Sequence, residues 1–437
     1  MAMIEASKYR KSLNRTNELP LLHLVMLFQF VSMLLLTFRD GVMDAFSFQM
    51  SLYLPIGTFL GLKIISKLFP VDRCIFILTA FLSSLGVVLL RAVLKTTADA
   101  SDQALFLLIG YFLMILSAFL IRLVRAWEKL SVIAMPLALG FLCLPFVFGS
   151  PSATADSWVK IGGVQFQPSE LIKPVLILVL SAGFSRKEGF RVWWRYVLFA
   201  GLACSVLFLQ PDLGAVFLYF IITVCLFYAG TGNYKVTIAV LLIAVLGVAV
   251  FLKLLNSIDA FSYLASRIAI WQNPFSGAYE DARQIVQGLI SIASGGLFGS
   301  GLGLGSADRV AVVASDYIFA ALSEEFGILF TICVLIVYLV LLIRGTTIAM
   351  NARSRFHALT ALGCVFALTS QMLLIVCGNL HLIPLTGVTM PFVSGGGSSM
   401  LSSMIQAGIL LGISSVNAED EYDDLMRITR GQWREEE

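Results

Sequence analysis

The chain of 437 residues carries long apolar runs along almost its whole length. A helix that spans a bilayer needs about 20 consecutive, mostly apolar residues. Only 13% of the residues are charged and the mean hydropathy is +0.90, which excludes a soluble globular domain. The runs predict an all-α polytopic integral membrane protein with about twelve transmembrane helices. The expected spans are residues 20–38, 45–69, 74–94, 103–124, 130–149, 168–185, 195–211, 212–230, 235–255, 316–343, 356–378 and 397–416.

Most of the 30 Lys and Arg residues fall in one set of alternating loops and ends. Because basic residues are retained on the cytoplasmic side, this set predicts that both termini are cytoplasmic. Three long polar or Gly-rich interruptions, at residues 150–167, 256–315 and 379–396, then face outward. No Lys/Arg-rich block indicates a nucleic-acid partner, and no nucleotide-binding motif occurs. Function is therefore expected in the outer loops.

Glu170 and Lys173 fall within an expected span, where a charge costs at least a few kcal/mol. They are three residues apart, so they share one face of a helix. This pair, with Gln167 and Ser169 just before it, indicates a polar cluster that lines a cavity. A simple ion pair at a helix end, with the lysine reaching toward the membrane interface, is the alternative.

Three further carboxylates stand near the outer ends of expected spans. Asp212 and Asp316 each occupy the first turn of a helix, where the helix dipole favours an anion. Each could cap its helix or face a substrate. Glu324 lies eight residues beyond Asp316, about 12 Å deeper along the helix, and is followed by Glu325. Two adjacent carboxylates inside a span are costly unless they are paired or protonated.

Two outer loops are rich in glycine. A run of three glycines stands between Ser394 and Ser398, and another Gly-rich loop follows an expected amphipathic helix at residues 284–293. Backbone N–H groups in such loops can bind an anion such as phosphate, although glycines also permit close helix packing. An amphipathic helix beside a polar cavity suits a lipid substrate with a long tail and a charged head.

Five ordered motifs together resemble the SEDS family (shape, elongation, division and sporulation) over residues 74–416. The motifs are residues 158–163 with 167–173, 210–214, 287–299, 315–320 with 324–327, and 384–394. The resemblance implies a peptidoglycan glycosyltransferase that polymerises lipid II, an undecaprenyl-pyrophosphate disaccharide-pentapeptide, at the outer face of the bacterial cytoplasmic membrane. It also implies a class B penicillin-binding protein as partner. A divalent cation, Mg or Mn, has been associated with the family, but its ligands are not evident in this sequence.

The resemblance also implies roles for individual residues. The essential aspartate of the family maps onto Asp316, which we expect to take the proton of the acceptor hydroxyl as a general base. The family's paired Glu and Lys map onto Glu170 and Lys173, and Glu170 orients or neutralises Lys173. Lys173, Arg283 or Gly-rich N–H groups are candidates to stabilise the leaving pyrophosphate. The expected substrate-binding residues are Gln167, Ser169, Asp212, Arg283, Gln287, Glu324, Ser394, Gly396 and Ser398.

The same resemblance divides the chain into three parts. Residues 1–73 hold a cytoplasmic N-terminus and two additional helices, and residues 74–416 hold the usual ten-helix body. Residues 417–437 form an acidic tail that is expected to be solvated. The large outer loop, 256–315, lies between the ninth and tenth helices. Three positions depart from the usual pattern, since an Arg, a His or similar polar residue, and a Tyr are replaced by Ser157, Ala314 and Gly395.

Two other functions fit some of these features. A lipid II flippase would also use many helices and an intramembrane Glu170–Lys173 pair. However, the two halves of the chain show no matching repeat, and the polar motifs gather on the outer side. The second alternative hypothesis is a non-catalytic scaffold of a cell-wall synthase. It predicts that glycan chains appear only when a separate glycosyltransferase is present.

Overall fold

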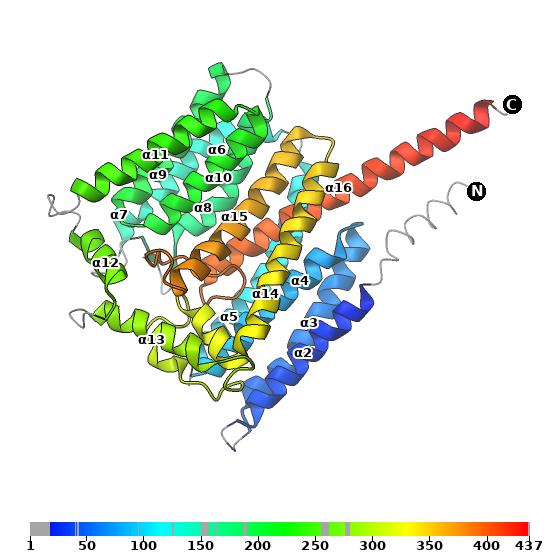
Figure 1. Ribbon diagram of the computed structural model, residues 1–437. Helices are drawn as coiled ribbons and strands as arrows, with labels where there is room; N and C mark the ends of the chain where they lie inside the picture. The colour runs from blue at the N-terminus through cyan, green and yellow to red at the C-terminus, as the bar shows by residue number, and fades with distance from the viewer. Residues whose placement is uncertain are drawn as a thin grey trace.

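The computed structural model is a bundle of long helices with one short β-hairpin (Figure 1). It describes residues 18–435 apart from 40, 42, 95, 125, 150–156, 162–163, 187–189, 255–261 and 276–279. The basic stretch before residue 18, which contributed to the predicted orientation, lies outside the described residues.

The helix boundaries follow the expected spans closely. The first half of the chain forms α2 (Leu19–Thr37), α3 (Ala45–Leu68), α4 (Arg73–Val93), α5 (Ala98–Leu123), α6 (Trp127–Leu142), α7 (Leu144–Phe148), α8 (Pro168–Phe184) and α9 (Phe190–Leu209). The second half forms α10 (Leu213–Thr231), α11 (Tyr234–Leu254), α12 (Ser262–Gln272), α13 (Glu280–Ser294), the short 3-10 helix η3 (Ala307–Arg309), α14 (Ile318–Asn351), α15 (Arg355–Asn379) and α16 (Gly397–Glu435).

The helices identify a multi-pass membrane protein, as predicted. Among the described residues, nine helical segments are long and apolar enough to cross a bilayer. Helices α9 and α11 contain shorter apolar stretches, and α8 has 17 residues. These three coincide with the remaining expected spans, so the number of twelve crossings stays a prediction.

A small β-hairpin leads into α8. Strands β1 (Val159–Ile161) and β2 (Val164–Phe166) pair antiparallel, with Val159 opposite Phe166. Helix α8 then begins at Pro168, whose missing N–H is no loss in the first turn. The hairpin therefore leads directly into the first turn of α8, which carries Glu170.

The core of the bundle is formed by α4, α8, α15 and α16, whose side chains are mostly buried. Small residues allow these helices to approach closely. A Cβ added to Gly412 on α16 would lie 2.6 Å from the carbonyl oxygen of Ala118 on α5. Helices α2, α5 and α11 instead expose large apolar side chains on their outer faces, as a lipid environment requires.

Helix α14 differs from the predicted single span. It begins at Ile318, with Tyr317 at the N-cap position, so Asp316 lies before the helix and does not cap it. The helix is also broken at Gly327, which has φ +78° and ψ 170°. Such a left-handed φ favours glycine, which explains how the chain can be interrupted at this position.

The acidic C-terminal segment is also more ordered than a simple solvated tail. Helix α16 continues through it to Glu435. Glu419 pairs with Arg122 at the end of α5 at 2.5 Å, and Asp420 and Asp424 pair with Arg353. These charges remain partly exposed, so each pair contributes at most about 1 kcal/mol.

Candidate active site

The candidate site contains a buried ion pair on α8. Lys173 Nζ lies 2.7 Å from Glu170 Oε2, and the lysine is only 1% exposed. The predicted sharing of one helix face by these two residues is therefore confirmed. Because burial strips both charges of water, the pair must be completed by other hydrogen bonds to be stable.

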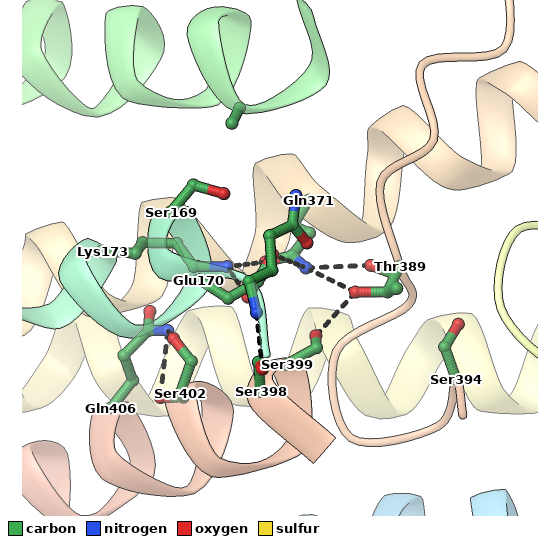
Figure 2. Close-up of polar contacts among 12 residues, drawn as sticks. Ser169, Glu170, Lys173, Gln371, Thr389, Ser394, Ser398, Ser399, Ser402 and Gln406 are labelled. Carbon is green, nitrogen blue, oxygen red and sulfur yellow. Dashed lines mark hydrogen bonds and ion pairs between the residues drawn. The ribbon is translucent and has the colours of Figure 1, made fainter. Parts of the chain in front are cut away.

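Gln371 on α15 supplies those hydrogen bonds (Figure 2). Its Oε1 accepts a hydrogen bond from Lys173 Nζ at 2.5 Å, and its Nε2 donates to the backbone oxygen of Thr389 at 3.0 Å. The Thr389 hydroxyl in turn donates to Ser399 Oγ on α16 at 2.6 Å. One polar network thus joins α8, α15, α16 and the segment 380–396 between α15 and α16. We call this segment the outer segment, after its predicted side of the membrane.

Asp212 accepts hydrogen bonds from two residues at the start of α8, Gln167 and Ser169. Its Oδ2 accepts hydrogen bonds from Gln167 Nε2 at 2.8 Å and from Ser169 Oγ at 3.1 Å. Its Oδ1 accepts from the backbone N–H of Ala215, so it also caps α10 as the sequence allowed. Burial raises the pKa of Asp212, and the hydrogen bonds from Ala215, Ser169 and Gln167 oppose that rise.

A small pocket lies between these two groups. It is lined by Glu170, Lys173, Asp212 and the first turns of α10, and by Gly387 from the outer segment. Its volume is about 10 Å³, which is room for about one water molecule. A sugar ring does not fit in this closed form, so a substrate would have to bind above the pocket or widen it.

Asp316 is not itself one of the residues that line this pocket, but it lies next to one of them. A Cβ on Gly387 would lie 3.8 Å from Asp316 Oδ2, which places the carboxylate beside a pocket-lining residue. The backbone oxygen of Asp316 accepts a hydrogen bond from Asn379 Nδ2 at 2.7 Å. Burial raises the pKa of Asp316, while a hydrogen bond from Ser315 and the charge of Arg267 on α12 act to lower it.

Two of the three glycines in the run at residues 395–397 use their N–H groups within the protein, so anion binding by this loop stays a prediction that rests on the first turn of α16, which begins at Gly397. The N–H of Gly395 donates to the carbonyl of Ala314 at 2.7 Å, and the N–H of Gly396 points to Gln103 Oε1 at 3.4 Å. Ser394 Oγ donates to the carbonyl of Ser315 at 2.7 Å. Ser394 and Gly395 therefore hold the turn that carries Asp316, while Gly396 bonds to α5.

Ser398 has a comparable supporting position. It is 4% exposed, and its hydroxyl accepts a hydrogen bond from the backbone N–H of Gln167 at 3.0 Å. This contact joins the first turn of α16 to the residue that precedes α8. Ser398 therefore ties α16 to the backbone of Gln167, whose side chain bonds Asp212.

Glu324 and Glu325 are buried and hold the second Gly-rich loop. Glu324 Oε1 accepts the backbone N–H of Ser306 at 2.7 Å, and Glu325 Oε2 accepts that of Gly303 at 2.5 Å. The backbone of the loop also bonds to the broken part of α14, since Ser300 N–H donates to the Glu324 carbonyl at 2.8 Å. These hydrogen bonds give Glu324 a structural role, and its expected substrate contact stays a prediction.

Arg283 and Gln287 lie on the amphipathic helix α13, which packs against α14. Arg283 is exposed and Gln287 is half-buried. The neighbouring Gly288 packs closely on the ring of Tyr317, where an added Cβ would lie 2.7 Å from the ring. Helix α13 thus packs beside the residue that follows Asp316, but among the described residues neither Arg283 nor Gln287 lines the pocket.

Comparison with known proteins now identifies the family. The profile of the FtsW, RodA and SpoVE family, described as a cell cycle protein, matches residues 68–419. The chain belongs to this family. Its sequence is 31% identical over 339 residues to the peptidoglycan glycosyltransferase RodA of Mycobacterium tuberculosis, covering 72% of this chain and 70% of that protein.

Solved structures share the fold. A chain from a peptidoglycan synthase complex that coordinates polymerisation and crosslinking gives a TM-score of 0.66 at 22% identity, covering 79% of this chain and 98% of that chain. The crystal structure of RodA from Thermus thermophilus gives 0.59 at 24% identity, covering 79% and 96%. The chain therefore shares the fold of these proteins, while its division into a ten-helix body and two additional helices stays a prediction.

Two of the positions that depart from the usual FtsW/RodA pattern lie in contact. A Cβ on Gly395 would be 3.5 Å from Ala314 Cβ and 2.8 Å from Leu90 Cδ2, so the site has no room for a tyrosine in this arrangement. Ala314 and Gly395 therefore allow the turn before Asp316 to pack directly on the glycine run. Ser157, the third departure, is half-buried just before β1.

The described residues do not form a protein-only metal site. No group of three or more His, Cys, Asp or Glu side chains converges among them. Asp316 faces Ser315 and Arg267 rather than a second carboxylate. Mg²⁺ normally keeps waters and takes one or two carboxylates together with substrate phosphates. The described residues therefore do not supply a site for a resident cation by themselves, and the Mg or Mn expected from the family resemblance stays a prediction.

Sequence reasoning missed Gln371, Thr389 and Asn379. Gln371 is fully buried within a long apolar helix, and this position was the available signal, because a polar side chain inside a span needs a partner. Thr389 and Asn379 gave no comparable signal, since Thr and Asn are common at helix ends and in loops. Their roles depend on the packing of α14 against α15.

Proposed function

We propose that this member of the FtsW/RodA family polymerises lipid II into β-1,4-linked glycan strands at the outer face of the bacterial cytoplasmic membrane. The observation that carries the proposal is that Asp316 lies beside Gly387, which lines the same pocket as Lys173. Relatives named peptidoglycan glycosyltransferase, among them RodA and FtsW proteins, support the same reaction.

Asp316 acts in this proposal as the general base. The 4-hydroxyl oxygen of the acceptor GlcNAc bonds to the anomeric carbon of the donor MurNAc, and the hydroxyl proton passes to the Asp316 carboxylate. Burial, which raises the pKa of Asp316, makes it a better proton acceptor than an exposed aspartate. A single displacement converts the α-linked donor to a β-linked product, so no carboxylate nucleophile is needed.

The bond between the anomeric carbon and the pyrophosphate oxygen breaks as the new bond forms, and its electron pair leaves with the lipid pyrophosphate. Lys173 is the buried cation nearest to the pocket and would stabilise this charge through a region of low dielectric. Glu170 and Gln371 hold its ammonium group in place. Asp212 keeps Gln167 and Ser169 ordered at the pocket wall.

Two further assignments belong to the same proposal. A structural relative is part of a peptidoglycan synthase complex that couples polymerisation to crosslinking, which supports a class B penicillin-binding protein as partner. The distribution of Lys and Arg supports cytoplasmic termini, with the pocket facing outward.

The experiment uses the purified full-length protein in lipid vesicles with labelled lipid II, alone and with the partner penicillin-binding protein. Glycan strands formed by a preparation free of any other glycosyltransferase support the polymerase. Strands that appear only when a separate glycosyltransferase is added would identify a scaffold. Movement of lipid II between leaflets without strand formation would identify a flippase.

A further inference from the structure

The two additional N-terminal helices lie outside the region that the family profile matches, which begins at residue 68. In Figure 1, α2 and α3 run side by side along α4 and the long helix α14. If they only anchored the chain in the membrane, the face they turn toward the body would need nothing beyond apolar packing. Their inner face instead carries specific polar and aromatic contacts.

The first of these contacts lies in the middle of the hairpin formed by α2 and α3. Gln29 on α2 is fully buried, and its Nε2 donates to Thr58 Oγ1 on α3 at 2.9 Å and approaches Ser84 Oγ on α4 at 3.1 Å. Interhelical hydrogen bonds of this kind fix the register of helices in lipid, where apolar packing alone is unspecific. One side chain thus joins three helices.

An aromatic cluster extends the hairpin to α14. The ring of Phe28 stacks on Phe330 with centroids 5.8 Å apart and meets Phe81 of α4 edge-on at 5.2 Å. Phe28 also lies 6.1 Å from Phe326, which precedes the break at Gly327. The hairpin therefore packs against both sides of the interruption in α14.

The outer end of the hairpin is tied to the end of α4. Arg91 Nε lies 2.8 Å from Asp44 Oδ2, and both side chains are largely buried. Burial alone acts to raise the pKa of Asp44, but hydrogen bonds from Ser47 and Arg91 and the charge of Arg91 lower it. Arg39 donates to the backbone oxygen of Ala92 at 2.8 Å, near the C-terminus of α4.

Arg39 also contacts the Gly-rich loop. A Cβ added to Gly303 would lie 2.5 Å from Arg39 Cδ, so the arginine stem packs directly on this glycine. Gly303 is the residue whose N–H bonds to Glu325, and Gly303 has φ +77°, which fixes the turn of the loop. The hairpin therefore reaches the loop that is bonded to the broken part of α14.

We propose that the hairpin of α2 and α3 is a buttress for the Gly-rich loop and the α14 break, and that Arg39 is a positioning residue for the site. Because α14 begins two residues after Asp316, movement of its first turns would displace the carboxylate. This inference rests on the proposed function only where activity is the readout. The contacts themselves predict a local change that can be measured without substrate.

The test compares Arg39→Met, Arg39→Lys and the control Ile56→Ala in the full-length protein. Ile56 is 52% exposed on the outer face of α3, so its truncation leaves the buttress intact. Hydrogen–deuterium exchange of residues 296–306 is measured in lipid vesicles, together with kcat and KM for labelled lipid II. Displacements of about 1 Å can reduce a rate on the order of 100-fold.

We expect Arg39→Met to speed exchange at residues 296–306 and to lower kcat roughly tenfold with little change in KM. Arg39→Lys should recover part of both effects, and Ile56→Ala should behave as the unmodified protein. Unchanged exchange at residues 296–306 in Arg39→Met overturns the buttress, whatever the activity. If the unmodified protein forms no strands, the proposed function fails, while the exchange result still decides the buttress.

Discussion

Lys173 on α8 donates a hydrogen bond to Gln371 on α15, with 2.5 Å between Nζ and Oε1. Gln371 in turn donates a hydrogen bond to the backbone oxygen of Thr389. Thr389 belongs to the same segment as Gly387, which lies beside Asp316. The network thus joins the buried ammonium group to the same segment that passes beside Asp316. In the proposed reaction, this network holds the pyrophosphate-stabilising charge in fixed relation to the base.

Replacing Gln371 with methionine keeps the side-chain volume but removes both hydrogen bonds. Leaving the buried Thr389 carbonyl and Lys173 with fewer partners should cost about 1–3 kcal/mol of stability. We also expect lower kcat for lipid II polymerisation. Thermal unfolding in vesicles and steady-state kinetics measure the two effects, with Leu373→Met, on the exposed face of α15, as the matched control. Equal behaviour of the two variants would show that the network has no role.

The Glu170–Lys173 pair predicts strong coupling between two substitutions. Removing one member of a buried pair leaves an uncompensated charge and typically costs about 3–5 kcal/mol. Glu170→Gln and Lys173→Met should therefore each be more damaging than expected from the loss of one contact. The double variant should be less destabilised than the sum of the single ones. A double-mutant cycle on thermal unfolding checks this, and strictly additive effects would contradict the pairing.

The Gly-rich loop predicts a steric effect at Gly299. This residue has φ +85°, and a Cβ on it would lie 2.3 Å from the Glu325 carbonyl oxygen. Gly299→Ala should therefore destabilise the protein by more than about 1 kcal/mol. Gly247→Ala on α11 is the control, because nothing lies within 4 Å of its added Cβ. A thermal shift of the same size for both variants would rule out the tight loop packing.

The pH dependence of polymerisation should report the raised pKa of Asp316. A base must be deprotonated, so kcat/KM should fall as pH drops through a pKa above the ordinary aspartate value of about 3.9. The Arg267 charge acts to lower this pKa. Arg267→Gln should therefore move the acid limb to higher pH, while Arg267→Lys should leave it nearly in place. An acid limb that both variants leave unmoved would assign it to another group.

Most of the fold could be predicted because lipid imposes simple rules on a chain. Apolar runs and the Pro168 start gave α8 and its neighbours to within a few residues. The Glu170–Lys173 pair was also predictable, since two opposite charges three residues apart in a span have few alternatives.

The rest depended on contacts between distant segments. The break at Gly327 is stabilised by backbone hydrogen bonds between residues 324–329 and residues 296–301. No local sequence pattern predicts a pairing between these two segments. For the same reason the sequence could not show that the N–H groups of Gly395 and Gly396 bond to Ala314 and Gln103. Gln371 acquires its role only when α15 packs against α8.

The central claim is that Asp316 is the base of the reaction, and the most direct measurement is single-turnover polymerisation of labelled lipid II by Asp316→Asn in vesicles. The asparagine keeps the shape of the side chain but cannot accept the proton. We expect the rate to fall by on the order of 100-fold or more, with unchanged lipid II binding and unchanged thermal unfolding. Strand formation by Asp316→Asn at the rate of the unmodified protein would contradict the account.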